Sequence, residues 1–341
     1  MPALRAFGEI VKRRFAFYGG LVVALAFFVA FATVMPGTSQ RGSRIAASSE
    51  EKALGEALKA HVTALAATIG ERNVGRGDSL LQARDYILSA VGALPAFRDG
   101  RLQREDVGAD GSHAENIILA LPGETAALVV VGAHYDSAQG APGADDNATG
   151  VAATLELAKR LAGHRFHKTV RFVLFANEEP PYFQNAGMGS LTNAQNSRLR
   201  GEPIDAMLSL ESLGYYSDAA GSQRYPWPVG LLYPDRGDFV AFVGNLGSRS
   251  LVRRSIAAFR AAAQFPSEGA ALPAGLPGIG WSDQWAFWQS GYPAIMVTDT
   301  APFRNPRYHQ NTDTPAGIDY VKLGRVTLGL DYVVRQLAGR D

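Results

Sequence analysis

Hydrophobic residues are spaced in three different ways along this chain, and each spacing predicts a different kind of element. An uncharged run extends from Phe15 to Met35, which is about the length that crosses the hydrocarbon core of a bilayer. Apolar residues recur at helical intervals between Glu51 and Ile69. Short, wholly apolar runs such as residues 128–131 are typical of buried strands. The chain therefore predicts one membrane-length segment followed by a folded domain.

Beyond residue 78 predicted helices and strands alternate. The helices are expected at 79–91, 150–161, 239–263 (broken near Gly247) and 321–337. The strands are expected at 128–131, 169–175, 207–210 and 294–297. Alternation of this kind favours a layered α/β fold with a mostly parallel sheet.

Basic residues lie before the long apolar run and predict its orientation. They are Arg5, Lys12, Arg13 and Arg14. Flanking positive charge favours a cytoplasmic N-terminus, so the folded domain should face the extracytoplasmic side, periplasmic or extracellular. A cleaved signal peptide is the alternative, but its apolar core is usually shorter, so we favour a single-pass anchor. The expected organisation is a cytoplasmic N-terminus (1–14), a transmembrane helix (15–35), a small polar linker (36–50) and a folded domain (51–341).

Composition removes several classes of function. The net charge is +1, and Lys and Arg form no stripe with interleaved aromatic residues, so nucleic acid is not an expected partner. The chain has no cysteine, which excludes disulfides, cysteine-bound zinc and thiol catalysis. The Gly-x-Ser-x-Gly, His-Glu-x-x-His and Gly-x-x-x-x-Gly-Lys patterns do not occur. Any metal must therefore be held by histidines and carboxylates.

Such residues follow the predicted strands, where ligands bind in α/β sheets. In chain order they are His134, Asp136, Glu178, Glu179, Glu211, Tyr308 and His309. The flexible loop PGADDNATG adds Asp145 and Asp146. Each residue alone is ordinary, since a lone histidine or a glutamate pair is usually solvated or structural. Together they indicate a metal site, in which one carboxylate of the 178–179 pair can bind a metal while the other faces the reacting water.

At this point the chain resembles the M28 family of zinc peptidases. The matching segments appear in the family's order from about residue 51 to the end: VVVGAHYDS, GAPGADDNATG, FANEEP, LSLESLGYY, WSDQWAFWQSGYPAIMVTDT and RYHQNTDTP. The segments IGERN and NIILALPG extend the likeness toward the N-terminus. The resemblance implies a three-layer αβα sandwich around a central mixed, mostly parallel sheet.

The resemblance also implies a set of roles. The ligands of two Zn²⁺ ions would be His134, Asp146, Glu179, Glu211 and His309, with Asp146 bridging both ions because it lies four residues before Gly150. Glu178 would be the general base, Asp136 would orient His134, and Tyr308 would polarise the scissile carbonyl. Ligation by nitrogen and oxygen alone suits zinc and leaves Co²⁺ or Mn²⁺ as alternatives.

Two positions depart from the family pattern. Family members often have Asp where Glu211 stands, and often have Ser-Asp-His where Ser282-Asp283-Gln284 stands. Asp283 would line the substrate pocket or serve a structural role. Both differences bear on substrate preference.

The leading interpretation is a metallo-aminopeptidase that removes N-terminal residues from peptide substrates. A glutaminyl-cyclase-like enzyme with one zinc is the first alternative, and a non-catalytic membrane-tethered binding domain is the second. Carboxypeptidase and dipeptidase specificities also stay open, and the sequence does not determine the oligomeric state.

Overall fold

The sheet of the domain has eight strands in the part of the chain that the structure describes. This computed structural model describes residues 2–41, 46–92, 94–108 and 114–339. The strands are β1 (Leu102–Asp106), β2 (Glu115–Leu121), β3 (Thr125–His134), β4 (Lys168–Phe175), β5 (Ile204–Glu211), β6 (Val240–Asn245), β7 (Ser267–Leu272) and β8 (Ala294–Thr298). Their order across the sheet is β1-β2-β4-β3-β5-β8-β6-β7. The strands β4, β3, β5 and β8 form a parallel centre, and antiparallel pairs flank it on both sides.

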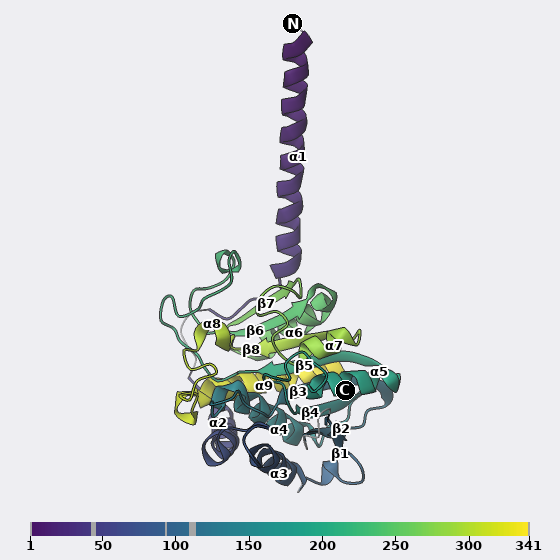
Figure 1. Cartoon of the computed structure of the whole chain (residues 1–341), viewed down its shortest axis with the longest axis vertical. Helices are drawn as coiled ribbons and strands as arrows, with labels where there is room; N and C mark the ends of the chain where they lie inside the picture. Colours follow the sequence, from purple (N-terminus) through teal and green to yellow (C-terminus); the bar gives the residue numbers. More distant parts are fainter. Residues whose placement is uncertain (1, 42–45, 93, 109–113, 340–341) are drawn as a thin grey trace.

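Helices cover both faces of this sheet, as Figure 1 shows. The α-helices are α1 (Pro2–Thr33), α2 (Ser49–Thr63), α3 (Ser79–Gly92), α4 (Gly150–Leu161), α5 (Gly189–Leu199), α6 (Arg249–Ala262), α7 (Gln284–Gln289), α8 (Ala301–Arg304) and α9 (Tyr320–Ala338). One-turn 3₁₀ segments lie at Pro95–Phe97, Val229–Leu231, Leu246–Ser248 and Pro315–Gly317. Single π-turns lie at Ala64–Ile69 and Ala144–Thr149.

The side chains of β3 show how the two faces are built. Val129 and Val131 point to one side, where they join the large core formed with α2, α4 and α9. Val130 points to the other side and joins a smaller core with α5 and α7. Because successive residues of a strand alternate between faces, a wholly apolar strand must be covered on both. The three-layer αβα sandwich with a mixed sheet is therefore confirmed.

One predicted helix is partly wrong. The stretch 239–263 is not one broken helix, because residues 240–245 form β6, and α6 begins only at Arg249. The apolar run of β6 pairs with β8 on one side and β7 on the other. Helix and strand are hard to separate in a short apolar run by periodicity alone, and here the pairing with two strands decides. The expected break near Gly247 is the strand–helix boundary.

Most of the N-terminal helix α1 projects away from the domain (Figure 1). Among the described residues it is the one helix long and apolar enough to cross a membrane, over Ala16–Thr33. Length and composition alone do not separate an anchor from a signal sequence. Residues 42–45 of the expected linker lie outside the described residues.

A matched pair of leucines tests where the core lies. Leu58 on α2 is fully buried, whereas Leu199 at the end of α5 is 85% exposed. We expect Leu58→Ala to lower the free energy of unfolding by about 2–5 kcal/mol, because it leaves a cavity. Leu199→Ala should change it by less than about 0.5 kcal/mol. Urea denaturation of the full chain in detergent measures both, and equal effects would contradict this account of the core.

Candidate metal centre

The predicted site residues meet at the carboxyl ends of the parallel strands. His134 ends β3 and Glu211 ends β5, while Glu178 and Glu179 follow β4 by a few residues. The ends coincide because these strands are parallel and paired nearly in register. The π-turn before α4 brings Asp146 to the same edge, and the loop after β8 brings His309.

These residues form two groups that share Asp146. In the first group, His134 Nε2 lies 3.3 Å from Asp146 Oδ1 and 3.2 Å from Glu211 Oε2. In the second, His309 Nε2 lies 3.1 Å from Asp146 Oδ2 and 3.2 Å from Glu179 Oε2. Asp146 therefore turns one carboxylate oxygen toward each histidine. Ligand atoms of His134, Asp146 and Glu179 also lie within 4.8 Å of one another, which is a separation that suits a metal ion.

The carboxylate of Asp136 contacts three residues of the site, His134, Glu178 and Glu179. One of its oxygens lies 3.4 Å from Nδ1 of His134, on the side of the ring away from Asp146. Both oxygens accept backbone N–H bonds, from Glu178 at 3.0 Å and from Glu179 at 3.0 Å. Asp136 thus fixes the histidine ring and the turn that carries both glutamates, as an outer-shell carboxylate does in metal sites.

A second set of buried polar groups shapes the loop around Asp146. The carboxylate of Asp313 accepts the backbone N–H groups of Asp145 and Asp146 at 3.0 and 3.2 Å. Asp145 itself points away from the histidines and accepts bonds from the Gly214 N–H and the Asn305 side chain. The structure therefore gives the two adjacent aspartates different surroundings, and only Asp146 faces the site.

Arg72 binds the backbone of the loop that carries Asp146. Its guanidinium is fully buried and donates to backbone carbonyls of Tyr135 at 3.0 Å and Gly143 at 2.9 Å, and to that of Pro142. Burial lowers the pKa of Arg72 to about 10, although the charges of Asp136 and Asp313 oppose the shift. The arginine therefore adds positive charge beneath a surplus of carboxylates.

That surplus dominates the electrostatics of the site. Burial raises the pKa of Glu178 well above its ordinary value and that of Glu179 to about 7, and neighbouring carboxylates add to both shifts. Burial opposes protonation of His134, but the charges of Glu211 and Glu178 raise its pKa well above the usual range. A divalent cation among these carboxylates would offset the repulsion that raises their pKa values.

Buried atoms without hydrogen-bond partners point to the same conclusion. Among the described residues, Nε2 of His309 and Oε1 of Glu179 have no hydrogen-bond partner although both are buried. Nε2 of His309 lies close to two carboxylate oxygens but outside hydrogen-bonding geometry. Unsatisfied buried polar atoms are costly, and a divalent ion between the imidazole and the carboxylates would satisfy them. The residues therefore fit zinc or another divalent metal.

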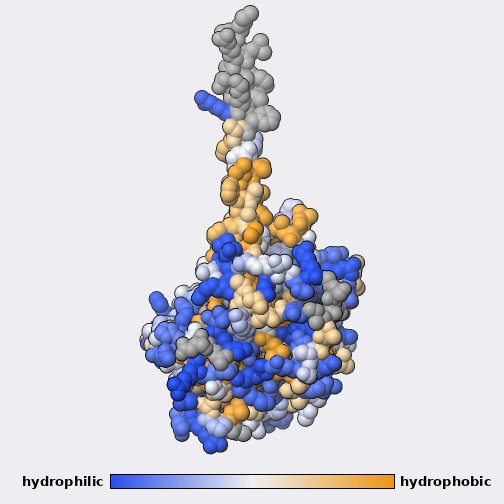
Figure 2. All heavy atoms as spheres, turned by 180° about the vertical axis from the view of Figure 1, so that it is seen from behind, coloured by the Kyte–Doolittle hydropathy of each residue, from blue (hydrophilic) through white to orange (hydrophobic). Residues whose placement is uncertain are grey.

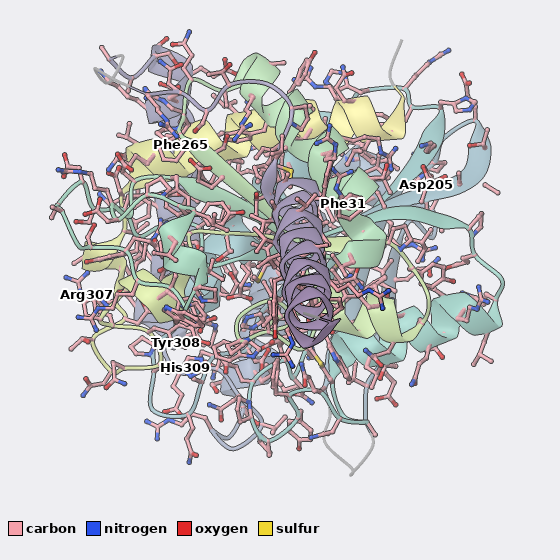
Figure 3. The ribbon with its side chains drawn as sticks, turned by 90° about the horizontal axis from the view of Figure 1, so that it is seen from above. Phe31, Asp205, Phe265, Arg307, Tyr308 and His309 are labelled. Atoms are coloured by element: carbon pink, nitrogen blue, oxygen red, sulfur yellow. The ribbon has the colours of Figure 1, made fainter. Side chains whose placement is uncertain are left out.

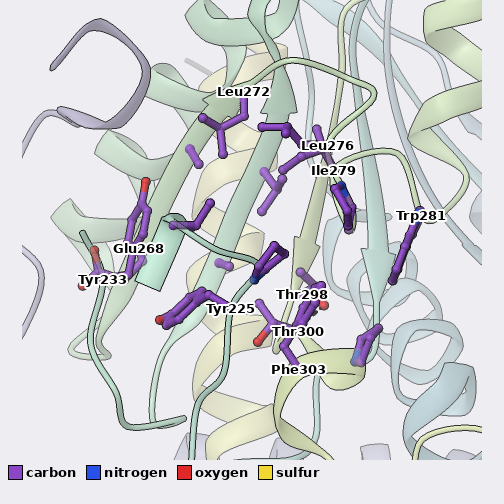
Figure 4. Close-up of a pocket in the computed structure, with 18 of the residues that line it drawn as sticks. Tyr225, Tyr233, Glu268, Leu272, Leu276, Ile279, Trp281, Thr298, Thr300 and Phe303 are labelled. Carbon is purple, nitrogen blue, oxygen red and sulfur yellow. Dashed lines mark hydrogen bonds between the residues drawn. The ribbon is translucent and has the colours of Figure 1, made fainter. Parts of the chain in front are cut away.

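An apolar cavity of about 220 Å³ opens beside this centre, and Figure 4 shows residues that line it, among them Glu268 and Leu272 of β7. Glu211 and Tyr308 line it where it meets the metal-site residues. Its other walls are largely apolar and include Tyr225, Tyr233, Ile279, Trp281 and Phe303. The cavity can accept an apolar group whose attached atoms lie at the metal centre.

Tyr308 and Asp283 differ in how they relate to this cavity. Tyr308 stacks on the His309 ring, with centroids 3.9 Å apart, and Figure 3 shows the two together in one loop. Asp283 is fully buried, and burial raises its pKa to about 7. The cavity wall includes Trp281 instead. Contact between Asp283 and a substrate stays a prediction.

Sequence reasoning assigned no role to several residues of the site. Ser282 donates to Oε2 of Glu211 at 2.7 Å, and Ser212 donates to Oε1 at 2.9 Å. These serines hold the longer glutamate in place. Asp313 and Arg72 lie within the matching segments RYHQNTDTP and IGERN, but their residue types and positions indicated no role for them. A buried arginine or serine carries no local signal of its partners, because those partners lie far away in the chain.

Carboxylates and imidazoles gathered at the carboxyl ends of parallel strands form a donor set for divalent metal ions, so the fold and the site are those of an α/β metalloenzyme. The family model "Peptidase family M28" matches residues 116–334, which is more than half of the chain. The chain therefore belongs to Peptidase family M28, and it is a peptide hydrolase of the zinc metallopeptidase class.

Two relatives illustrate the similarity in sequence. The uncharacterized protein YfbL of Escherichia coli is 37% identical over 320 residues, which cover 91% of this chain and 93% of YfbL. The probable lipoprotein aminopeptidase LpqL of Mycobacterium tuberculosis is 32% identical over 236 residues, 65% of this chain and 45% of LpqL. The chain thus spans nearly all of YfbL but only about half of that aminopeptidase.

Solved structures share the fold. LapB from Legionella pneumophila aligns with a TM-score of 0.64 at 17% identity, covering 92% of this chain and 81% of LapB. The glutaminyl cyclase of Fimbriiglobus ruber aligns with a TM-score of 0.59 at 18% identity, covering 87% of this chain and 99% of the cyclase. At these identities the alignments establish that this chain shares the architecture of both proteins, and nothing about its reaction.

The protonation of the metal-free site predicts how metal uptake depends on pH. Glu179, with its pKa near 7, and His309, whose neighbouring carboxylates raise its pKa to about 10 against the effect of burial, hold protons near neutral pH. A metal must displace these protons. We expect the zinc affinity, measured by competition with a chelator, to rise between about pH 6 and about pH 8 with proton release.

Stability gives a second readout with a defined sign. Burial raises the pKa of Glu179 from its ordinary value of 4.5 to about 7 in the folded, metal-free chain. Protonated Glu179 therefore stabilises the fold fully below pH 4.5, and this contribution is lost as the pH rises through about 7. The melting temperature of the metal-free chain should fall over that window, whereas zinc should remove the decline. A zinc affinity that does not change with pH would show that these groups are not displaced from their protons by metal.

Proposed function

We propose that this chain is a membrane-anchored aminopeptidase that holds two zinc ions and removes N-terminal residues from peptides. The position of Asp146 carries the proposal, because its two oxygens face two separate histidine–carboxylate groups. His134 and Glu211 would complete one ion's site, and His309 with Glu179 would complete the other. Bound zinc would supply a Lewis acid for the scissile carbonyl and would acidify the attacking water.

Glu178 is suited to be the general base. Its Oε2 lies 3.9 Å from Nε2 of His134, next to both metal groups but outside the short contacts that define them. A buried carboxylate with a raised pKa is a stronger base than a solvated one. In the proposed mechanism Glu178 takes a proton from the water that attacks the peptide carbonyl, then delivers it to the nitrogen of the departing peptide.

Tyr308 and the apolar cavity would position the substrate. Tyr308, which lines the apolar cavity together with Glu211, can donate a hydrogen bond from its hydroxyl to the carbonyl oxygen as negative charge develops there. The cavity would accept an apolar side chain at the substrate's N-terminus. The excess of carboxylates would attract the positively charged amino group.

The anchor belongs to the same proposal. We propose that residues 15–35 stay in the membrane, that residues 1–14 are cytoplasmic and that the domain faces the extracytoplasmic side. The length and apolar composition of α1 support an anchor, and the basic residues before Phe15 support this orientation.

Metal stoichiometry tests the two-ion proposal. We expect elemental analysis of the zinc-reconstituted full chain to give two ions per chain. His309→Ala should reduce this number, because it removes a ligand from one group only. His167→Ala should retain both ions, because His167 is exposed and directly precedes β4, at the end of that strand opposite to the site. One ion in the unmodified chain would favour a cyclase-like enzyme instead, and none would refute the metal centre.

The adjacent glutamates can be separated by their response to zinc. Glu178→Gln keeps the side-chain size but cannot accept a proton, so kcat should fall at least about 100-fold with both metals retained. Glu179→Gln removes a ligand, so metal affinity should fall and excess zinc should restore part of the activity. Hydrolysis of aminoacyl and N-terminal glutamine substrates measures both effects. Near-normal turnover in Glu178→Gln, or its rescue by zinc, would contradict these roles.

A further inference from the structure

An uncharged, apolar segment forms the tip of a long loop between β5 and β6. Residues 226–232 read PWPVGLL, and we call this segment the apolar tip. Trp227 is 88% exposed, Leu231 is 80% exposed and Leu232 is 49% exposed. Single exposed apolar residues are common, but three large ones within six positions form a patch that water solvates poorly.

The neck of this loop is held in a defined shape. The Tyr225 hydroxyl donates to the Pro234 carbonyl at 2.7 Å, which closes the loop just below the apolar tip. The Tyr233 hydroxyl donates to the carbonyl of Gly269 at 2.8 Å, which ties the neck to β7. These two hydrogen bonds hold the neck of the loop, so the apolar tip is exposed at a fixed position on the domain.

The end of the anchor helix contacts the same strand. The side chain of Met35 packs on Gly269, where an added Cβ would lie only 2.9 Å from Met35 Cγ. Helix α6 fixes the last turn of α1: Arg249 donates to the Phe31 carbonyl and stacks on the Phe31 ring at 4.0 Å, and Arg253 donates to the Val34 carbonyl at 2.6 Å. The loop neck and the anchor thus meet at one residue of β7.

This junction places the apolar tip on the membrane side of the domain. In Figure 1 the loop between β5 and β6 rises beside α1 to the level of the helix's lower end. Figure 2, seen from behind, shows hydrophobic surface at that height next to the helix. A bilayer around Ala16–Thr33 would have its interface at this level. Tryptophan and leucine at such a height match the interfacial zone, where aromatic residues are favoured.

We propose that the apolar tip inserts into the interface of the bilayer that holds α1, as a second membrane contact of the domain. The proposal rests on the membrane anchoring argued above. Two contacts, the helix and the tip, would fix the tilt of the domain relative to the bilayer, whereas a single helix can still tilt in the membrane together with the domain that it holds. Pro226, Trp227 and Val229 also line the apolar cavity, so insertion opens that cavity at the membrane surface. Peptides whose apolar part partitions into the interface would then reach the metal centre directly.

The absence of cysteine makes a site-specific test possible, because an introduced cysteine is the only thiol. Leu231→Cys places a label on the apolar tip. Leu199→Cys places it at a leucine of matched exposure, 85%, at the end of α5. Both full-length variants would carry an environment-sensitive fluorophore and would be reconstituted in phosphatidylcholine vesicles containing nitroxide-labelled lipid.

We expect the label at position 231 to be quenched several-fold more than the label at 199, with emission shifted to the blue. Vesicle flotation establishes anchoring in each variant, and thermal unfolding establishes that both are folded. Equal quenching at the two positions in chains that float would overturn insertion of the tip. Chains that do not float would overturn the anchor and this proposal together. Metal content and hydrolysis of a water-soluble substrate report on the proposed activity separately, since neither position lies in the metal centre.

Discussion

The burial of several carboxylates at one edge of the sheet is the constraint on which the rest of this structure depends. Asp136, Asp146, Glu178, Glu179 and Glu211 are all largely removed from water. Moving a charge into a protein interior is expensive unless an opposite charge or several hydrogen bonds accompany it. Two histidines and one arginine do not balance these groups. The fold therefore requires either protons or metal cations at this edge, and the metal is the form that leaves a carboxylate able to act as a base.

Much of the remaining architecture distributes that charge. Asp136 and Asp313 each accept two backbone N–H groups, so they stabilise negative charge with fixed dipoles and shape the two loops that carry ligands. Arg72 does the complementary work, because it donates to backbone carbonyls under the same loop. Asp136 contacts His134 at Nδ1, on the side of the ring away from Asp146, so it supports the ligand from outside the metal position. These three residues explain why a shell of buried polar residues extends well beyond the atoms that a metal would touch.

The parts of the structure that could be predicted from the sequence are those with a local signal. The strand around Val131 is a continuous apolar run, and the sequence changes sharply to polar residues where the strand ends, which marks the edge of the sheet. By contrast, β7 (Ser267–Leu272) reads SEGAAL and has no run of large apolar residues, so its strand conformation depends on its pairing with β6. Within the site, the ligand candidates stood out by residue type and order. Their supports, such as Ser282 on Glu211, did not, because a serine is common and its partner is 71 positions away.

The arginines of α6 connect the domain to the N-terminal helix α1. A helix that ends in a flexible linker would leave its domain free to rotate, yet here Arg249 and Arg253 bind the last carbonyls of α1, where positive charge also complements the helix dipole. Arg260 continues the contact to the carbonyls of Pro36 and Gly37. The predicted linker is thus anchored over its first residues. Because α6 also packs against β6 and β7, which form the floor of the apolar cavity, the orientation of α1 fixes the orientation of that cavity. With α1 in a bilayer, as proposed above, the membrane would become part of the geometry of substrate access, because the side chains that hold α1 would also set the direction from which a peptide can approach.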